Sequence, residues 1–296
     1  MPSRFFIALR GSIFLLFEMR SFLLTTFALT AFAFNSILCR MALGKDEADA
    51  ASFTFVRLLA GAITLALISA LFGNTKNVLR TGHWVSAFFL FAYAVCFSFA
   101  YLGLTTGTGA LILFGSVQMT MIATSILKGE RPGIWELCGV AVAFGGLVYL
   151  MLPGLASPPI VSSLLMAAAG AAWGFYTLRG RGSENPLADT TGNFIRAVPM
   201  ILIAAIPFIG GMHLSVRGLM LAVLSGSLAS GVGYSVWYAA LKYHTSTSAA
   251  VLQLAVPVIA AVGCVVLLSE SADMRLLVAS VPVLGGILLA IFGKNR

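Results

Sequence analysis

The chain has 296 residues, of which 59% are hydrophobic and 9% are charged, with a mean hydropathy of +0.99 and a net charge of +8. Soluble domains carry about 25% charged residues, and disordered chains combine low hydrophobicity with high charge, so this composition excludes both classes. At about 20 apolar residues per membrane span, the chain has room for about ten helices and no sizeable soluble domain. We therefore expect an all-α integral membrane protein.

Ten apolar stretches follow one another along the chain, joined by short connections. In chain order they are 22–41, 51–72, 84–104, 107–127, 134–152, 160–178, 193–210, 219–241, 248–268 and 276–292. Residues 1–20 are interrupted by Arg10 and Glu18, so they are too short and too charged to form a span. We expect an interfacial or cytoplasmic segment without a functional role, or a segment upstream of a true start at Met19.

The basic residues predict the orientation of the bundle. With the N-terminus inside, the inner loops hold twelve Lys and Arg residues. The outer loops then hold four, namely Arg40, Lys45, Arg217 and Arg275. Cytoplasmic loops collect basic residues, so both termini are expected in the cytoplasm, and the positive charge is a topology signal without nucleic-acid binding.

The second half of the chain repeats the first at a nearly constant offset. Five features recur 139 or 140 positions later: Arg40 as Arg179, Phe55-Val56-Arg57 as Phe194-Ile195-Arg196, Ala110 as Ala250, Glu130 as Glu270, and Gly145-Gly146 as Gly285-Gly286. Each half holds five spans, an odd number, so the second half must enter the membrane inverted. We expect two inverted five-helix repeats, residues 21–153 and 154–296, which is the architecture of many secondary transporters.

These features resemble the drug/metabolite transporter superfamily in its ten-span EamA-type form. The resemblance rests on the duplication, Glu130 and Glu270, the paired glycines, and Pro257 in the ninth span. Within this superfamily, the chain most resembles the bacterial YddG aromatic amino-acid exporters. The resemblance implies a central cavity built from spans one, three, four, six, eight and nine, with spans five and ten peripheral. Val117 stands where the first half would match Pro257, so a proline hinge is expected in one half only.

Charged groups are scarce within the predicted spans. All ten carboxylates lie in loops or at span ends, so proton antiport through a central carboxylate is not expected. Arg57 and Arg196 lie within span ends, and we interpret both as snorkelling anchors. Without a deep cation, phosphorylated substrates such as nucleotide sugars are disfavoured.

Aromatic and amide side chains remain as candidate substrate contacts. Helical spacing places the aromatic candidates on single faces of the third, sixth and eighth spans. They are Tyr93, Tyr101, Trp173, Tyr176, Tyr234, Trp237 and Tyr238. The candidate amides are Asn35, Gln118 and Gln253. Such a set suits a zwitterion with an apolar body, although the aromatics could serve helix packing and the amides could form interhelical hydrogen bonds.

His244 lies at the inner mouth of the ninth span and is the candidate titrating gate. The serine- and glycine-rich stretch 225–233 lacks the flanking pattern of a nucleophile elbow, so it predicts close helix packing and no enzyme activity. No metal or cofactor is expected.

The leading hypothesis is an exporter of aromatic or other hydrophobic amino acids in the bacterial inner membrane. It would act as a monomer, and its central binding site would be largely uncharged. Transport would be facilitated and would proceed by alternating access, in which the two halves of the chain rock. Proton coupling through His244 is a variant. The alternatives are an exporter of lipophilic cations such as viologens, which would use cation–π contacts, and a structural or lipid-flipping protein whose aromatics only pack.

Overall fold

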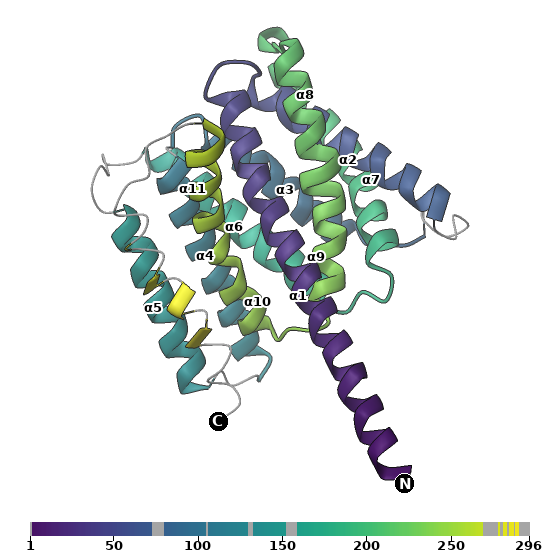
Figure 1. Ribbon diagram of the computed structural model, residues 1–296. Coiled ribbons are helices and arrows are strands. Elements are labelled where there is room, and N and C mark those ends of the chain that lie inside the picture. Colours follow the sequence, from purple (N-terminus) through teal and green to yellow (C-terminus); the bar gives the residue numbers. More distant parts are fainter. Residues whose placement is uncertain are drawn as a thin grey trace.

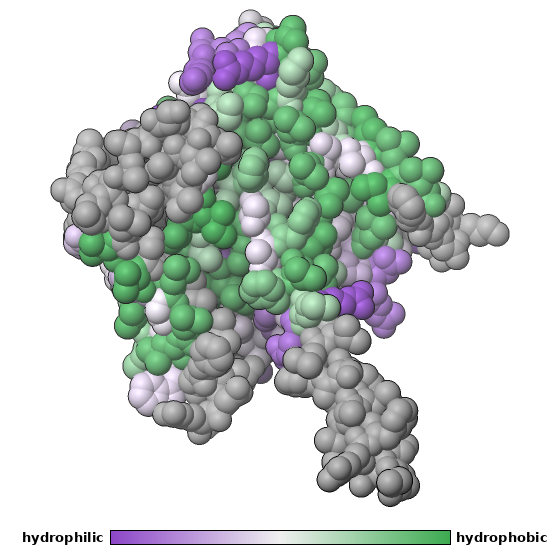
Figure 2. All heavy atoms as spheres, in the orientation of Figure 1, coloured by the Kyte–Doolittle hydropathy of each residue, from purple (hydrophilic) through white to green (hydrophobic). Residues whose placement is uncertain are grey.

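The computed structural model describes residues 2–72, 80–104, 106–129, 133–151 and 159–268, with short pieces at 278, 281–282, 284–286 and 288–289. Within these residues, five helices are long and apolar enough to cross a membrane, and four shorter apolar helices accompany them. Figure 2 shows hydrophobic residues over most of the coloured part of the visible face and hydrophilic ones gathered near its two ends. The chain is therefore an all-helical, multi-pass membrane protein. The predicted tenth span lies mostly outside the described residues.

The helices of the first half follow the predicted spans closely. They are α1 (Pro2–Leu43), α2 (Ala50–Phe72), α3 (Trp84–Ala100), α4 (Thr106–Leu127) and α5 (Ile134–Met151). The backbone of α1 runs without a break from the predicted N-terminal segment into the first span, and Figure 1 shows it extending beyond the other helices. No proline follows Pro2 in this helix to interrupt its hydrogen bonds.

The second half is less regular than the sequence predicts. It comprises α6 (Ile160–Gly180), α7 (Pro186–Ala205), the 3₁₀ turn η2 (Ile206–Gly211), α8 (Val216–Leu224), the π-helix η3 (Ser225–Val232), α9 (Gly233–Leu241), α10 (Ser246–Gln253) and α11 (Ala255–Leu268). The start predicted for the seventh span, residue 193, is wrong by seven residues. Asn185 caps α7 by accepting a hydrogen bond from the Ala188 amide at 3.1 Å, and Pro186 suits its first turn.

The eighth span was predicted as one regular helix, but it contains a π-helical segment in its middle. Gly226 of this segment lies directly against the backbone carbonyl of Arg57 in α2, where even one added methyl carbon would collide. The small residues that predicted close packing therefore do allow it. They also accompany a wider helical turn, a feature that is frequent at functional sites.

The ninth span is likewise divided, at Leu254, between α10 and α11. Pro257 explains the division, because a proline has no amide hydrogen for the carbonyl four residues earlier and its ring crowds that carbonyl. That carbonyl belongs to Gln253, the last residue of α10. Val117 stands at the corresponding position of α4, and α4 is continuous there.

Packing between helices is reciprocal between the two halves of the chain. Helix α3 packs against α6 and α7 of the second half, and the span α8–η3–α9 packs against α1 and α2 of the first. Helices α2 and α7 pack against each other. Helix α5 packs against α4 and α10 and lies at the side of the bundle (Figure 1), as the predicted peripheral position of span five requires. The helices thus form two packing groups that each draw on both halves: α1, α2, α7, α8–η3–α9 and α11, and α3, α4, α6 and α10.

Candidate substrate site

Aromatic rings from four spans meet at the centre of the bundle. The aromatic cluster consists of Phe32 on α1, Tyr93 on α3, Trp173 and Tyr176 on α6, and Tyr234 and Trp237 on α9. Trp173 is its hub, with ring centroids 4.6 Å from Tyr234, 5.0 Å from Tyr93 and 5.1 Å from Phe32. The faces predicted for the third, sixth and eighth spans therefore converge on one point.

A small cavity of about 20 Å³ lies inside this cluster. Its lining residues come from α1, α3, α4, α6 and α9, which are five of the six spans that the family resemblance implied. They are Phe32, Ser36, Tyr93, Leu113, Phe114, Trp173 and Tyr234. This volume holds about one water molecule, so in this conformation the centre of the bundle is closed.

The predicted amides are buried and hydrogen-bonded, and two of them contact the aromatic cluster. The indole nitrogen of Trp173 donates to Gln253 Oε1 at 2.6 Å, which brings the ninth span to the site. Asn35 Oδ1 accepts from Ser225 Oγ at 2.6 Å, and its amide group lies 3.5 Å from the Tyr93 hydroxyl. Gln118 instead donates to the Ala250 carbonyl at 2.6 Å, joining α4 to α10.

Arg57 corrects the sequence analysis. It was interpreted as a snorkelling anchor near an interface, but its side chain is 1% exposed and does not reach the surface. Its Nε donates to Ser230 Oγ at 3.0 Å and its NH2 group donates to the Tyr234 hydroxyl at 2.7 Å. The predicted uncharged centre is therefore wrong, because a guanidinium lies directly beside the aromatic cluster. Phosphorylated substrates were disfavoured because no deep cation was expected, and Arg57 is such a cation.

The π-helix η3 makes this arrangement possible. Ser225 and Ser230 are five residues apart, and both direct their hydroxyls at Asn35 Oδ1, at 2.6 and 3.4 Å. Residues five apart diverge around an α-helix, whereas the i→i+5 hydrogen bonds of a π-helix bring them onto one side. The wider turn thus presents two serines toward α1 and α2 at the depth of Arg57.

The two remaining predicted aromatic residues, Tyr101 and Tyr238, lie at the edges of the aromatic cluster. All ten predicted contact residues are buried. Tyr101 packs against Phe97, at a ring distance of 4.8 Å, and Tyr238 packs 4.9 Å from Tyr176 and donates to its carbonyl. His244 lies on the α9–α10 connection, with its Nε2 2.8 Å from Thr25 Oγ1 of α1.

Sequence reasoning missed three residues that build the site: Phe32, Arg57 and Ser230. Phe32 had a usable signal, since it lies one helical turn from Asn35 and shares its face. Arg57 had one as well, because an arginine seven residues into a predicted span is expensive and functional by default. No sequence signal locates Ser230, because its direction depends on the π-helical turn.

Two aspartates, one before α2 and one in α7, accept hydrogen bonds from backbone amides of loops in the opposite half of the chain. Asp49, at the start of α2, accepts hydrogen bonds from the Ala51 and Ser52 amides at 2.9 Å and from the His213 amide at 2.7 Å. Asp189, 140 positions later in α7, accepts one from the Gly82 amide at 3.0 Å. Each aspartate therefore holds the loop that precedes the third span of the opposite half.

The Asp49 carboxyl titrates differently from a free aspartate. Partial burial acts to raise its pKa, but hydrogen bonds from Ser52, from the His213 backbone and from Ala51 outweigh that effect and hold the pKa below its usual value. Asp49 is therefore expected to fasten α2 to the α7–α8 connection in its ionised form.

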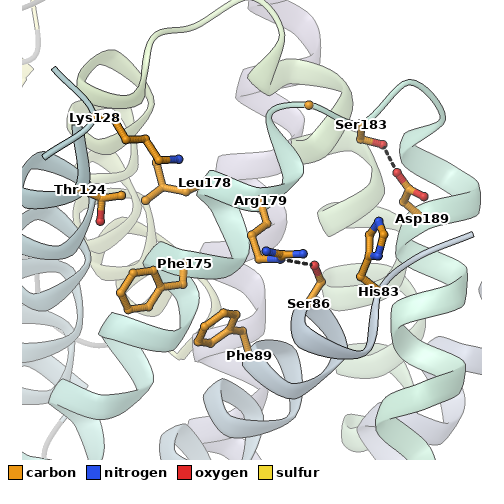
Figure 3. A pocket seen from close by; sticks show the side chains of 11 residues that line it. His83, Ser86, Phe89, Thr124, Lys128, Phe175, Leu178, Arg179, Ser183 and Asp189 are labelled. Atoms are coloured by element: carbon orange, nitrogen blue, oxygen red, sulfur yellow. Dashed lines mark hydrogen bonds between the residues drawn. The ribbon is translucent and has the colours of Figure 1, made fainter. Parts of the chain in front are cut away.

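A second, larger cavity of about 490 Å³ opens between α3, α4 and α6, at the end of the bundle that carries Asp189. Figure 3 shows Lys128 and Arg179 in its wall, with Arg179 donating to Ser86 at 2.9 Å, and Phe89 beside Phe175. These two rings are stacked 5.1 Å apart. None of the predicted contact residues lines this cavity.

A multi-pass helical bundle with reciprocal packing and a closed, polar and aromatic centre is built as a membrane carrier. Comparison with known families agrees, because the EamA-like transporter family matches residues 19–152 and again residues 161–292. The chain therefore belongs to the EamA-like transporter family, with two EamA domains, and it is a transporter and not an enzyme.

Three similar proteins match along most of this chain. An uncharacterized protein of Pseudomonas aeruginosa is 47% identical over 274 residues, covering 93% of this chain and 95% of its own. A protein of Salmonella typhimurium named a probable amino-acid metabolite efflux pump is 24% identical, covering 68% and 72%. A protein of Streptantibioticus cattleyicolor named a probable terminal-alkyne amino-acid exporter is also 24% identical, covering 88% and 90%.

A solved crystal structure shares the fold. It superposes with a TM-score of 0.78 over 93% of this chain and 98% of its own, at 19% sequence identity. At this identity the likeness extends to the helix arrangement alone.

Proposed function

We propose that this protein exports amino acids, aromatic or other hydrophobic ones first, by alternating access. The observation that carries the proposal is the aromatic cluster, four of whose six rings line a closed cavity where five spans meet. Ring-to-ring contacts with a substrate are worth about 0.5–1.5 kcal/mol each, and the polar groups beside them suit the charged ends of a zwitterion. The names of the two more distant relatives point to the same class of substrate.

The bodies that move, in this proposal, are the two packing groups and not the two halves of the sequence. Each group combines helices from both halves, and the aromatic cluster lies between them, with Phe32 and Tyr234 on one side and Tyr93 and Trp173 on the other. Separating the groups at one end would expose the cluster to one side of the membrane. Rocking of whole repeats, the motion that the sequence suggests, would instead break the reciprocal packing.

Lipophilic cations are the weaker candidate. The aromatic cluster could bind them by cation–π contact, but Arg57 already places a positive charge beside these rings, 5.4 Å from the Tyr93 centroid. Repulsion between this guanidinium and a dication such as a viologen opposes binding.

We propose further that both termini are cytoplasmic, that the chain works as a monomer in a bacterial inner membrane, and that transport is facilitative. The excess of basic residues in the inner loops supports the orientation. His244 remains the candidate for a proton-coupled variant, because it joins the α9–α10 connection to α1 through Thr25. The narrower resemblance to YddG aromatic amino-acid exporters also remains a prediction.

Uptake of labelled phenylalanine and threonine into proteoliposomes tests the proposal, with protein-free liposomes as the control. We expect faster uptake of phenylalanine than of threonine, at a rate that an imposed pH gradient does not change. Uptake that requires the gradient would contradict the facilitative mechanism and favour His244. Absence of uptake of both amino acids, in protein that transports methyl viologen, would overturn the proposed substrate class.

A further inference from the structure

Arg57 is a buried cation whose charge is not neutralised within its surroundings. It lies seven residues inside α2, and its guanidinium carbon is 5.4 Å from the Tyr93 ring centroid and 5.6 Å from that of Phe97. It donates hydrogen bonds to two neutral hydroxyls, of Ser230 and Tyr234, and the neutral Tyr93 hydroxyl also interacts with it. Among the described residues, no carboxylate forms an ion pair with it.

The NH1 group of this guanidinium is buried and has no hydrogen-bond acceptor. A buried charge normally has both a counter-ion and a full set of hydrogen bonds, because leaving water is costly without them. The interactions of Arg57 are incomplete in both respects. The missing partner is therefore an anion that supplies oxygen acceptors.

The neighbours of Arg57 place its guanidinium, which lacks a counter-ion, beside the central cavity. Tyr93 and Tyr234, which contact the guanidinium, both line that cavity. The Tyr234 hydroxyl accepts from Arg57 NH2, and a hydroxyl that accepts one hydrogen bond can still donate its own proton to another acceptor. Ser230 holds the guanidinium through Nε, and Gly226 of η3 packs on the backbone carbonyl of Arg57.

We propose that Arg57 and Tyr234 together bind the carboxylate of the transported substrate, so that the carrier selects molecules with one anionic end and an apolar body. This inference rests on the proposed function and adds its main determinant of specificity. The carboxylate accepts from Arg57 NH1 and from the Tyr234 hydroxyl, while the apolar body lies against Trp173. Charge-assisted hydrogen bonds of this kind are about twice as strong as neutral ones.

Two ligands that differ only at the carboxylate test the inference: phenylalanine and phenylalaninamide. Binding is measured as ligand-dependent thermal stabilisation of the purified protein. We expect the unaltered protein to bind phenylalanine about 10- to 100-fold more tightly than the amide. In the Arg57→Met variant this preference falls to within about threefold, and Tyr234→Phe reduces it partly. Arg57→Lys, which keeps the charge, restores part of the preference.

Matched controls are Arg196→Met and Tyr149→Phe, which lie outside the cluster and leave the preference unchanged. The inference would be overturned if the Arg57→Met protein is monodisperse but its affinity for both ligands falls by the same factor, since Arg57 would then only support the fold. An unaltered protein that binds both ligands equally would overturn it as well.

A third ligand, 3-phenylpropionate, separates this inference from the proposed function, because it carries the carboxylate without the ammonium group. Failure to transport amino acids, combined with 3-phenylpropionate binding that Arg57→Met abolishes, would overturn the proposed function and leave the anion site standing. Amino-acid transport with no dependence of the ligand preference on Arg57 would overturn the anion site and leave the proposed function standing.

Discussion

The same three-residue pattern occurs in both halves of the chain, yet its arginine has two different environments. Arg57 is 1% exposed and bonds to Ser230 and Tyr234 in the eighth span. Arg196, its counterpart, donates to the backbone carbonyls of Thr81 and Gly192 at 2.7 and 2.9 Å. It also lies 5.7 Å from the ring centroid of Trp84, a side chain that is 61% exposed.

Both arginines contact the third span of the opposite half, but at different depths. Arg196 reaches the start of that span and the loop before it, whereas Arg57 reaches its middle, where the π-helix supplies Ser230. The comparison shows how a duplicated fold acquires an asymmetric centre. One copy of the motif keeps a structural role near an end, and the other brings a charge to the aromatic cluster.

The largest expected effect separates the two arginines directly. Arg57→Met should lower phenylalanine uptake in proteoliposomes about 30-fold, because the substrate carboxylate loses its cation. Its melting temperature should change little, since methionine replaces an unpaired buried charge with an apolar chain. Arg196→Met should lower uptake less than about threefold. Equal losses of uptake in the two variants would remove the functional distinction between the copies.

Trp173 provides the second contrast, against the exposed Trp135 of α5. Trp173→Phe keeps an aromatic ring but loses the hydrogen bond to Gln253, so we expect KM for phenylalanine to rise about five- to tenfold with unchanged expression. Trp135→Phe should leave KM unchanged.

Alanine at Trp173 or Trp237 should also reduce transport, but truncating a buried tryptophan costs about 3–5 kcal/mol of stability. Retained transport in both alanine variants would contradict the assignment of the site.

A smaller effect is expected within the π-helix. Ser230→Ala removes the acceptor for Arg57 Nε and should reduce the phenylalanine uptake rate about three- to fivefold. Ser227→Ala is the matched control, because Ser227 is in the same π-helix but donates to the Val223 carbonyl of the preceding turn, at 2.7 Å. If the two serine variants have the same phenylalanine uptake rate, the hydrogen bond between Ser230 and Arg57 does not contribute to transport.

The smallest effect on transport is expected at Asp49, where the readout is stability. Its pKa is lower in the folded protein than in the unfolded chain, so its contribution is present above the usual aspartate pKa of about 4 and is lost as the pH falls below it. Asp49→Asn should lower the melting temperature by a few degrees at pH 7. It should also flatten the decline between pH 5 and pH 3. A parallel decline in both proteins, followed by differential scanning fluorimetry, would assign the acid sensitivity to other groups.

Much of the fold could be predicted because it follows from local properties. The apolar stretches have the length that a bilayer requires, and helical spacing identified the buried faces with Tyr93, Trp173 and Trp237. The breaks in regular structure were harder to locate. The division at Leu254 depends on Pro257, a signal that was present, whereas the π-helix arises in a serine- and glycine-rich segment that is equally compatible with a plain α-helix.

The sequence by itself determined the class of protein, the number and order of its spans, and the aromatic character of its centre, because composition and periodicity act within a single helix. Only the tertiary structure decided where Arg57 lies. Its position along the chain was interpreted as that of a snorkelling anchor, but α2 is packed between α7 and the α8–η3–α9 span, so the side chain has no path to an interface. Burial depends on the helices that surround a residue, and those helices are far away in sequence.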